Sequence, residues 1–244
     1  MNIGLRDGQE DCIFVNGKVF QERMFERVGA ITTEETGGVF AVCDGMGGHS
    51  RGEWASKFVC GALQDSLGHF QYSREFIEHL TEGIQNRIEN ETVENSGTTV
   101  AGVVLEGGNA IIFNAGDSRV YKITKKNLLY LSHDHSLVQY YVDIGYLSRD
   151  EAFSHQHKNV IDFGIGDVFK ADWAEGPKKI HIRDDVLGRD ECYLICTDGL
   201  NDVMKDDEIF ASLRPDPFER LSGFVNTLEE RMKDNVSFIL IGNA

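Results

Sequence analysis

The chain has 244 residues, with 40 acidic against 24 basic side chains, a net charge of −16 and a pI near 4.8. Nucleic acids and anionic membrane surfaces demand basic patches, so this balance argues against both as main partners. No apolar run reaches the roughly 18 residues that a membrane span needs, and the N-terminus lacks the apolar stretch of a signal peptide, so we expect a cytoplasmic protein.

The five cysteines are odd in number and lie mostly in or beside apolar stretches. This pattern favours reduced core thiols over a disulfide framework, and no Cys-x-x-Cys pair indicates a zinc site.

The chain opens with a predicted hairpin. Residues 12–15 and 19–20 flank Asn16-Gly17, a pair typical of type I′ turns. The continuous apolar run 39–43 predicts a strand covered on both faces, which leads into Asp44 and a glycine-rich turn.

Two helices and a set of strands follow. The first helix is predicted at residues 50–67, opened by a capping box that starts at Ser50, and the second at 73–93, with apolar residues at helical spacing. Three antiparallel strands and a fourth are then predicted at residues 98–105, 110–114, 119–123 and 128–131.

The second half begins with a polar, His-rich segment at about 134–168 that fits no long element apart from a short helix at 136–145. It predicts an inserted, mobile segment outside the core. Beyond it we predict strands at 179–182, 192–196 and 236–241 and a helix at 216–232.

Together these elements predict an α+β fold, a four-layer α-β-β-α sandwich of two mainly antiparallel sheets with flanking helices. The chain shows no internal repeat and no linker. We therefore expect one domain over residues 1–244.

Acidic residues gather at the predicted strand ends: Glu10-Asp11, Asp44, Asp117, Asp198 and Asp234. Each alone is more typical of a turn aspartate that bonds its own backbone. Several carboxylates at one sheet edge would repel each other unless a cation lies between them, and oxygen ligands select hard ions such as Mg²⁺ or Mn²⁺. The set therefore predicts a metal site.

The sequence resembles the bacterial form of the metal-dependent serine/threonine phosphatases of the 2C type, the PPM family. The most informative match is Asp44-Gly45-Met46-Gly47-Gly48-His49. The matching segments, which occur in the family's order, are residues 6–11, 44–53, 96–99, 114–119, 134–138, 197–200 and 234–236.

The resemblance implies a centre of two Mn²⁺ or Mg²⁺ ions. Asp44 would bridge both ions, and the carbonyl of Gly45 would bind one of them. Asp198 and Asp234 would complete the shell of the other ion, and Asp11 would hold metal-bound waters.

Further roles are implied for residues around this centre. Arg6 matches the phosphate-binding arginine of the family, and its planar fork suits two phosphoryl oxygens. Asp117 and Asp198 match the ligands of a third, weaker ion. The segment at about 134–168 corresponds to the flap, which influences substrate choice.

The implied function is hydrolysis of phosphoserine and phosphothreonine in proteins by a water activated by two metals, without a phosphoenzyme. Arg6, Asp11, Asp44 and Asp198 would carry catalysis. We expect phosphoprotein substrates of a bacterial Ser/Thr kinase as partners, and a monomer.

Departures from the family are few. Gln9 and Thr197 are mild changes from Asn and Ser, and Met46 stands where eukaryotic members have a His proposed as general acid, so no acid is assigned. The flap lacks its usual Arg and has Asp162 instead, which bears on substrate preference.

Two other functions are weighed. A catalytically weak regulatory or binding module on the same fold would show degraded ligands, and all are present. A metal-dependent nuclease is disfavoured by the acidic balance.

The His-rich flap could suggest a transition-metal cluster, but exposed or hydrogen-bonded histidines are the commoner case, and His49 is expected to support its turn.

Overall fold

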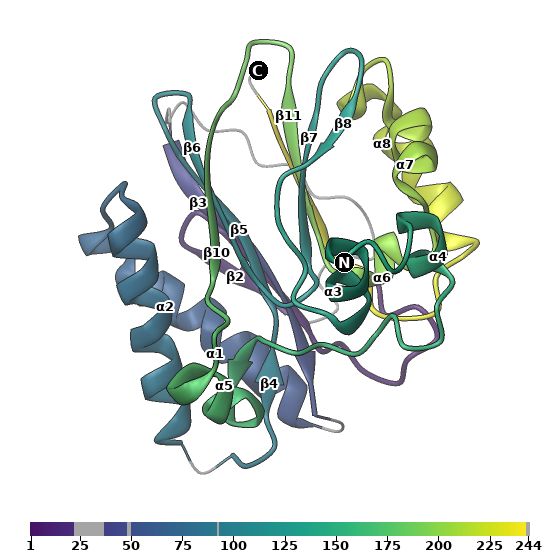
Figure 1. The fold of residues 1–244 in the computed structure, drawn as a ribbon. Coiled ribbons are helices and arrows are strands. Elements are labelled where there is room, and N and C mark those ends of the chain that lie inside the picture. The colour runs from purple at the N-terminus through teal and green to yellow at the C-terminus, as the bar shows by residue number, and fades with distance from the viewer. Residues whose placement is uncertain (22–36, 48–49, 92, 243–244) are drawn as a thin grey trace.

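Two antiparallel β-sheets pack face to face, with helices over both outer faces (Figure 1). The computed structural model describes residues 1–21, 37–47, 50–91 and 93–242. Over these ranges the predicted α+β, α-β-β-α sandwich is confirmed. His49 lies outside the described residues.

The first sheet has the strand order β10-β6-β5-β3-β1-β2. Its strands are β1 Asp11–Val15, β2 Lys18–Phe20, β3 Gly37–Met46, β5 Val100–Glu106, β6 Asn109–Ala115 and β10 His181–Val186. Two short strands extend it beside the end of β3, namely β4 Gly97–Thr98 and β9 Ile165–Gly166.

The second sheet has the order β12-β11-β7-β8. Its strands are β7 Arg119–Ile123, β8 Leu128–Tyr130, β11 Cys192–Cys196 and β12 Phe238–Gly242.

Helices cover the outer face of each sheet. On the first sheet lie α1 Ser50–Ser66, α2 Arg74–Glu89 and α5 Lys170–Glu175 (Figure 1). On the second lie α7 Asp206–Leu213 and α8 Pro217–Glu229, while α3 Leu137–Asp143 and α4 Arg149–Phe153 belong to the flap and α6 Asp198–Asn201 follows β11. None of the described helices is long and apolar enough to cross a membrane.

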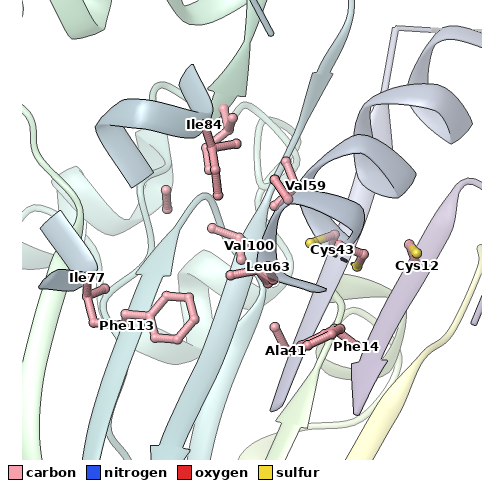
Figure 2. Packing of buried hydrophobic residues seen from close by; sticks show 14 of the residues in the cluster. Cys12, Phe14, Ala41, Cys43, Val59, Leu63, Ile77, Ile84, Val100 and Phe113 are labelled. Carbon is pink, nitrogen blue, oxygen red and sulfur yellow. Dashed lines mark hydrogen bonds between the residues drawn. The ribbon is translucent and has the colours of Figure 1, made fainter. Parts of the chain in front are cut away.

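Alternation along the strands divides the core into layers. In β5, Val100 and Val104 face the helical layer of α1 and α2, and Ala101 and Val103 face the second sheet. Both faces of β5 are therefore buried, which explains its continuous apolar sequence. Figure 2 shows the helix-facing layer, in which Val59 and Leu63 of α1 lie beside Val100.

The hairpin is confirmed. Asn16 and Gly17 have φ of 38° and 92°, the two positive values that a type I′ turn requires, and Val15 pairs with Lys18 on either side of the turn. All five cysteines are free and buried, as predicted for core thiols.

Several sequence predictions need correction. Residues 119–123 do not continue the first antiparallel set, because β7 pairs with β11 and β8 in the second sheet. The chain leaves the first sheet at Gly116, where φ is +100° and a Cβ would lie 2.6 Å from Thr99. Helix α2 ends at Glu89 rather than at 93, where the Asn90 N–H bonds back to the carbonyls of Arg87 and Ile88.

The flap is also less separate than predicted. Phe163 and Ile165 are fully buried in the core layer beneath α1 and α2, and β9 pairs with β4. Periodicity missed these contacts because each buried stretch of the flap is at most four residues long. The short helices α5, α6 and α7 were not predicted either, and the strand expected at 179–182 lies instead at His181–Val186.

A buried lysine joins the two sheets at the end remote from Asp44. Lys122 of β7 donates from Nζ to the carbonyl of Val186 at 2.6 Å and forms ion pairs with Asp185 at 3.2 Å and Glu191 at 2.8 Å. Tyr193 of β11 donates to the same Asp185. Every polar group in this network has a partner, so it stabilises one relative placement of the sheets.

We predict that Lys122→Met lowers the free energy of unfolding by about 1–3 kcal/mol, because it leaves two partly buried carboxylates without their cation. The measurement is urea denaturation. Lys125→Met is the matched control, since Lys125 is 74% exposed and pairs with Asp190, which is 60% exposed, and it should change stability by less than about 0.5 kcal/mol. Equal effects of both variants would contradict the role of the network.

Candidate metal centre

Asp11 and Asp44 lie directly opposite each other across the β1–β3 pair. Like charges in that position destabilise a sheet unless something compensates them. The sequence placed Asp44 at the end of its strand, but β3 continues through Gly45 to Met46, which pairs with Gly97 of β4. Asp44 is therefore held inside a ladder rather than in a free turn.

Two threonines fix the backbone of Asp44. Its carbonyl accepts hydrogen bonds from the Thr99 amide and the Thr98 hydroxyl, both at 2.9 Å, and its own amide donates to Thr99 Oγ1 at 3.0 Å. Thr99 Oγ1 lies 2.7 Å from Ser118 Oγ, next to Asp117. These threonines were part of a matching segment, but sequence reasoning gave them no role because the bonds join residues 54 or 55 positions apart.

Gly45 is required by packing. A Cβ there would lie 2.1 Å from the carbonyl oxygen of Gly52 in the first turn of α1 and 2.7 Å from that of Glu10. The close approach of the α1 backbone thus excludes any side chain at Gly45. Its predicted carbonyl ligation stays a prediction.

Asp198 and Asp117 come from the second sheet and from the crossover to it. Asp198 opens α6 directly after β11, and the residue before it, Thr197, donates from Oγ1 to Asp11 Oδ2 at 3.0 Å. The same Oγ1 accepts the amide of Ser237 at 3.0 Å. One buried hydroxyl therefore connects Asp11 of the first sheet to both β11 and the approach to β12.

Asp234 lies beside the N-terminal segment. Arg6 Nη2 donates to its Oδ2 at 2.5 Å, and the amide of Asn235 donates to its Oδ1 at 2.8 Å. The structure therefore brings together two residues that were given separate roles, a phosphate ligand and a metal ligand.

Asn235 organises this segment and was missed as a functional residue. Its side chain accepts the Glu10 amide at 2.6 Å and donates to the carbonyls of Ile3 at 3.1 Å and Gly8 at 2.9 Å. It is 4% exposed. The only signal in the sequence was its place in the matching segment 234–236.

Burial and mutual repulsion raise the pKa values of the predicted ligands. Burial, and then the charges of neighbouring acids such as Asp198, raise the pKa of Asp11 to about 7 despite the Thr197 hydrogen bond. Burial raises the pKa of Asp198 to about 6. The pKa values of Asp44 and Asp117 also lie well above the ordinary range, through burial first and then the charges of nearby aspartates. Four carboxylates thus lie within electrostatic reach of each other.

The donor set fits a hard divalent ion. Asp11 Oδ1 and Asp117 Oδ1 are buried and make no hydrogen bond of good geometry, although the Ser237 hydroxyl lies close enough to Asp11 to favour its charged form. Carboxylate oxygens that lack hydrogen-bond donors and lie close to other carboxylates are suitable ligands for a Mg²⁺ or Mn²⁺ ion.

The side chains are nevertheless not closed into a finished coordination shell. Among the described residues, no three His, Cys, Asp or Glu side chains converge as ready-made metal ligands. Electrostatic repulsion between the carboxylates and the ion pair of Asp234 with Arg6 both oppose such convergence.

The flap histidines make other contacts. His135 is buried, with Nε2 2.9 Å from the carbonyl oxygen of Lys179, and His133 Nε2 lies 3.0 Å from Asp143. The rings of His155 and His157 lie 5.6 Å apart. Hydrogen bonds and ring packing therefore account for them.

A groove of about 510 Å³ begins at Asp117 and runs between the flap and the α6–α7 segment. Three pairs of opposite charges line it: Arg119 with Asp134 at 2.6 Å, Lys158 with Asp202 at 2.9 Å and Lys205 with Asp150 at 2.8 Å. The Nζ atoms of Lys158 and Lys205 lie 5.6 Å and 5.5 Å from the centre of the Phe153 ring. The groove is thus adjacent to the predicted centre, and charged residues of the flap form one of its walls.

Comparison with known proteins gives one consistent family. The sequence model of the family described as protein phosphatase 2C matches residues 26–236. The serine/threonine phosphatase stp of Listeria welshimeri is 28% identical over 196 residues, which cover 72% of this chain and 75% of that protein. The serine/threonine protein phosphatase PstP of Mycobacterium tuberculosis is 29% identical over 184 residues, covering 72% of this chain and 34% of that protein.

Solved structures agree. Stp1 from Staphylococcus aureus superposes with a TM-score of 0.80 at 26% identity, covering 100% of this chain and 92% of that chain. The catalytic domain of PstP, solved in complex with 2 manganese ions, has the same fold with a TM-score of 0.72 at 23% identity, covering 98% and 94% of the two chains.

The raised pKa values predict how metal stabilises the chain at different pH. A carboxyl group whose pKa is raised by folding contributes stability at low pH and loses it as pH rises through the folded value, here about 6 to 7 for Asp198 and Asp11. Above these pKa values the carboxylates are charged and repel each other, and bound Mn²⁺ should offset this repulsion. At low pH the ion would first have to displace protons from the same carboxyl groups. We therefore expect the increase in Tm caused by saturating MnCl₂ to be larger at pH 8 than at pH 5.5, measured by calorimetry.

The control is Asp11→Asn, which removes the group that titrates near 7 and should show a weaker pH dependence of the manganese increment. An increment in the unsubstituted protein that stays constant across this pH range would contradict the prediction.

Proposed function

The chain belongs to the protein phosphatase 2C family of bacterial-type serine/threonine phosphatases, and we propose that it hydrolyses phosphoserine and phosphothreonine in proteins by a metal-dependent mechanism. The observation that carries the proposal is the meeting of Asp11, Asp44, Asp117 and Asp198 at the junction of two sheets without enough positive charge to neutralise them. Asp11 and Asp117 are buried and Asp44 and Asp198 are half-buried, and bound cations would offset the repulsion within such a set.

We assign the metal ligands within this set. Asp44 would bridge two ions with the carbonyl of Gly45 as a further donor, and Asp198 and Asp234 would complete the second ion. Asp11 would orient the waters. Asp117 and Asp198 would serve a third ion. The fixed backbone of Asp44 and the Thr197 hydroxyl on Asp11 support these roles, because both hold the carboxylates before any ligand arrives.

When bound, Mn²⁺ or Mg²⁺ would lower the pKa of a water molecule and offset the charge of the phosphoryl group. The protein's own residues position the reactants. Arg6 would bind two phosphoryl oxygens through its planar guanidinium and so orient the phosphorus for in-line attack by water. Met46 has no titratable group, so it cannot supply the proton for the leaving oxygen, and we assign no general acid.

Direct attack by water requires no phosphoenzyme, and the thiols support this part of the proposal. Burial raises the pKa of Cys43, and also that of Cys196, so neither is a ready nucleophile beside the carboxylates.

The substrate class follows the relatives, which are named serine/threonine phosphatases. We propose that this chain acts as a single-domain, monomeric, cytoplasmic enzyme that opposes a bacterial Ser/Thr kinase. The groove beside Asp117 has room for the residues that flank a phosphorylated side chain.

Turnover of a phosphothreonine peptide and of p-nitrophenyl phosphate tests the proposal. We expect activity that depends on Mn²⁺ and is abolished by a chelator. Asp44→Asn should lower kcat/KM by at least about 100-fold, because it removes a charged ligand and not only a supporting hydrogen bond.

Asp184→Asn is the matched control, since Asp184 is an exposed acid of β10 that pairs with Arg74 at 2.7 Å; it should keep full activity. A chain without Mn²⁺-dependent turnover would instead be the catalytically weak regulatory module. Full activity in Asp44→Asn would refute the ligand assignment.

A further inference from the structure

Asp234 differs from the other predicted ligands because it already forms an ion pair with a side chain of the protein, that of Arg6. Arg6 Nη2 lies 2.5 Å from Asp234 Oδ2, and the Asn235 amide occupies Oδ1. Asp11 and Asp117 each keep one buried oxygen that makes no hydrogen bond of good geometry. In the metal-free chain, Arg6 therefore offsets the negative charge of Asp234, whereas Asp11 and Asp117 each keep an oxygen that such a charge could bind.

The backbone around Arg6 is fixed. Gly4 has φ of +58°, and a Cβ there would lie 2.2 Å from the carbonyl oxygen of Asp234. The Asn235 side chain bonds to the carbonyls of Ile3 and Gly8, one on each side of Arg6. Residues 3–8 thus form a loop that is attached to the segment carrying Asp234.

The side chain of Arg6, by contrast, is not packed in place. It is 57% exposed and Asp234 is 34% exposed. Ion pairs this open to solvent are weak. The guanidinium can therefore leave the carboxylate without any change in the backbone.

We propose that Arg6 is a placeholder cation that a divalent ion displaces from Asp234, so that metal loading releases the guanidinium for the phosphate of the substrate. The inference rests on the proposed function for the identity of the metal ligands. It makes Arg6 a positioning residue in the metal-free chain and a phosphate ligand afterwards. Because the two events share one carboxylate, they are linked: losing Arg6 favours the ion, and loading the ion favours phosphate.

The sign of this effect separates it from a supporting role. If Arg6 held Asp234 in place for the metal, removing Arg6 would weaken metal binding. If Arg6 competes with the metal, removing it strengthens metal binding. Loss of any positive charge favours cations slightly through long-range forces, so a remote arginine has to be removed as a control.

Calorimetric titration of the metal-free protein with MnCl₂ at 0.15 M salt is the test. Arg6→Gln should bind Mn²⁺ about two- to fivefold more tightly than the unsubstituted protein, the range expected for loss of an exposed ion pair. Arg220→Gln, which removes an exposed arginine of α8, should bind as the unsubstituted protein does. In an Asp234→Asn background, Arg6→Gln should have no further effect on Mn²⁺ affinity.

Binding of inorganic phosphate provides the second readout. Arg6→Gln should not change the weak affinity of the metal-free chain for phosphate, but it should lower the affinity of the Mn²⁺-loaded chain. Mn²⁺ binding to Arg6→Gln that is equal to or weaker than in the unsubstituted protein would overturn the inference while leaving the proposed function intact. If the unsubstituted protein bound no Mn²⁺, the proposed function itself would fail.

Discussion

Repulsion between four crowded carboxylates, two buried and two half-buried, is the constraint on which the rest of this structure depends. Asp11 and Asp44 face each other across one sheet, and Asp117 and Asp198 approach from the crossover and from the second sheet. Each would be more stable protonated or paired, which is why their pKa values rise. A fold that maintains this crowding gives up stability in its metal-free form and recovers it when cations bind.

The surrounding polar residues make that crowding possible. Thr98 and Thr99 hold Asp44, Thr197 holds Asp11, and Asn235 attaches the N-terminal segment. All four are buried. They donate to or fix the backbone of the acids without bringing a competing positive charge into the centre. At the opposite end of the sandwich the Lys122 network sets the relative position of the sheets, so the two halves of the site meet in one arrangement.

The sequence predicted the layers and most long elements because their signals are local. Asn16-Gly17 specifies its turn, and Asp216 caps α8 as expected, with its side chain accepting from the Phe218 and Glu219 amides. The crossover at Gly116 could not be predicted, since strand spacing does not show which sheet a strand joins. Asn235 was missed for a similar reason: its three partners lie at least 225 positions away in the chain.

The flap shows how a local departure changes a surface without disturbing the scaffold. Asp162, which stands where an arginine was expected, pairs with Lys178 and lines a second cavity rather than the groove at Asp117. The flap's cations in the groove are Lys158 and Arg149 instead, and Lys158 bonds to Asp202, one helical turn beyond Asp198. Positive charge therefore still borders the predicted centre, and the cation that pairs with Asp202 is a flexible ammonium. Since Lys158 cannot make the fork contacts of an arginine, discrimination between substrates has to depend on Arg149, the shape of the groove and its other side chains.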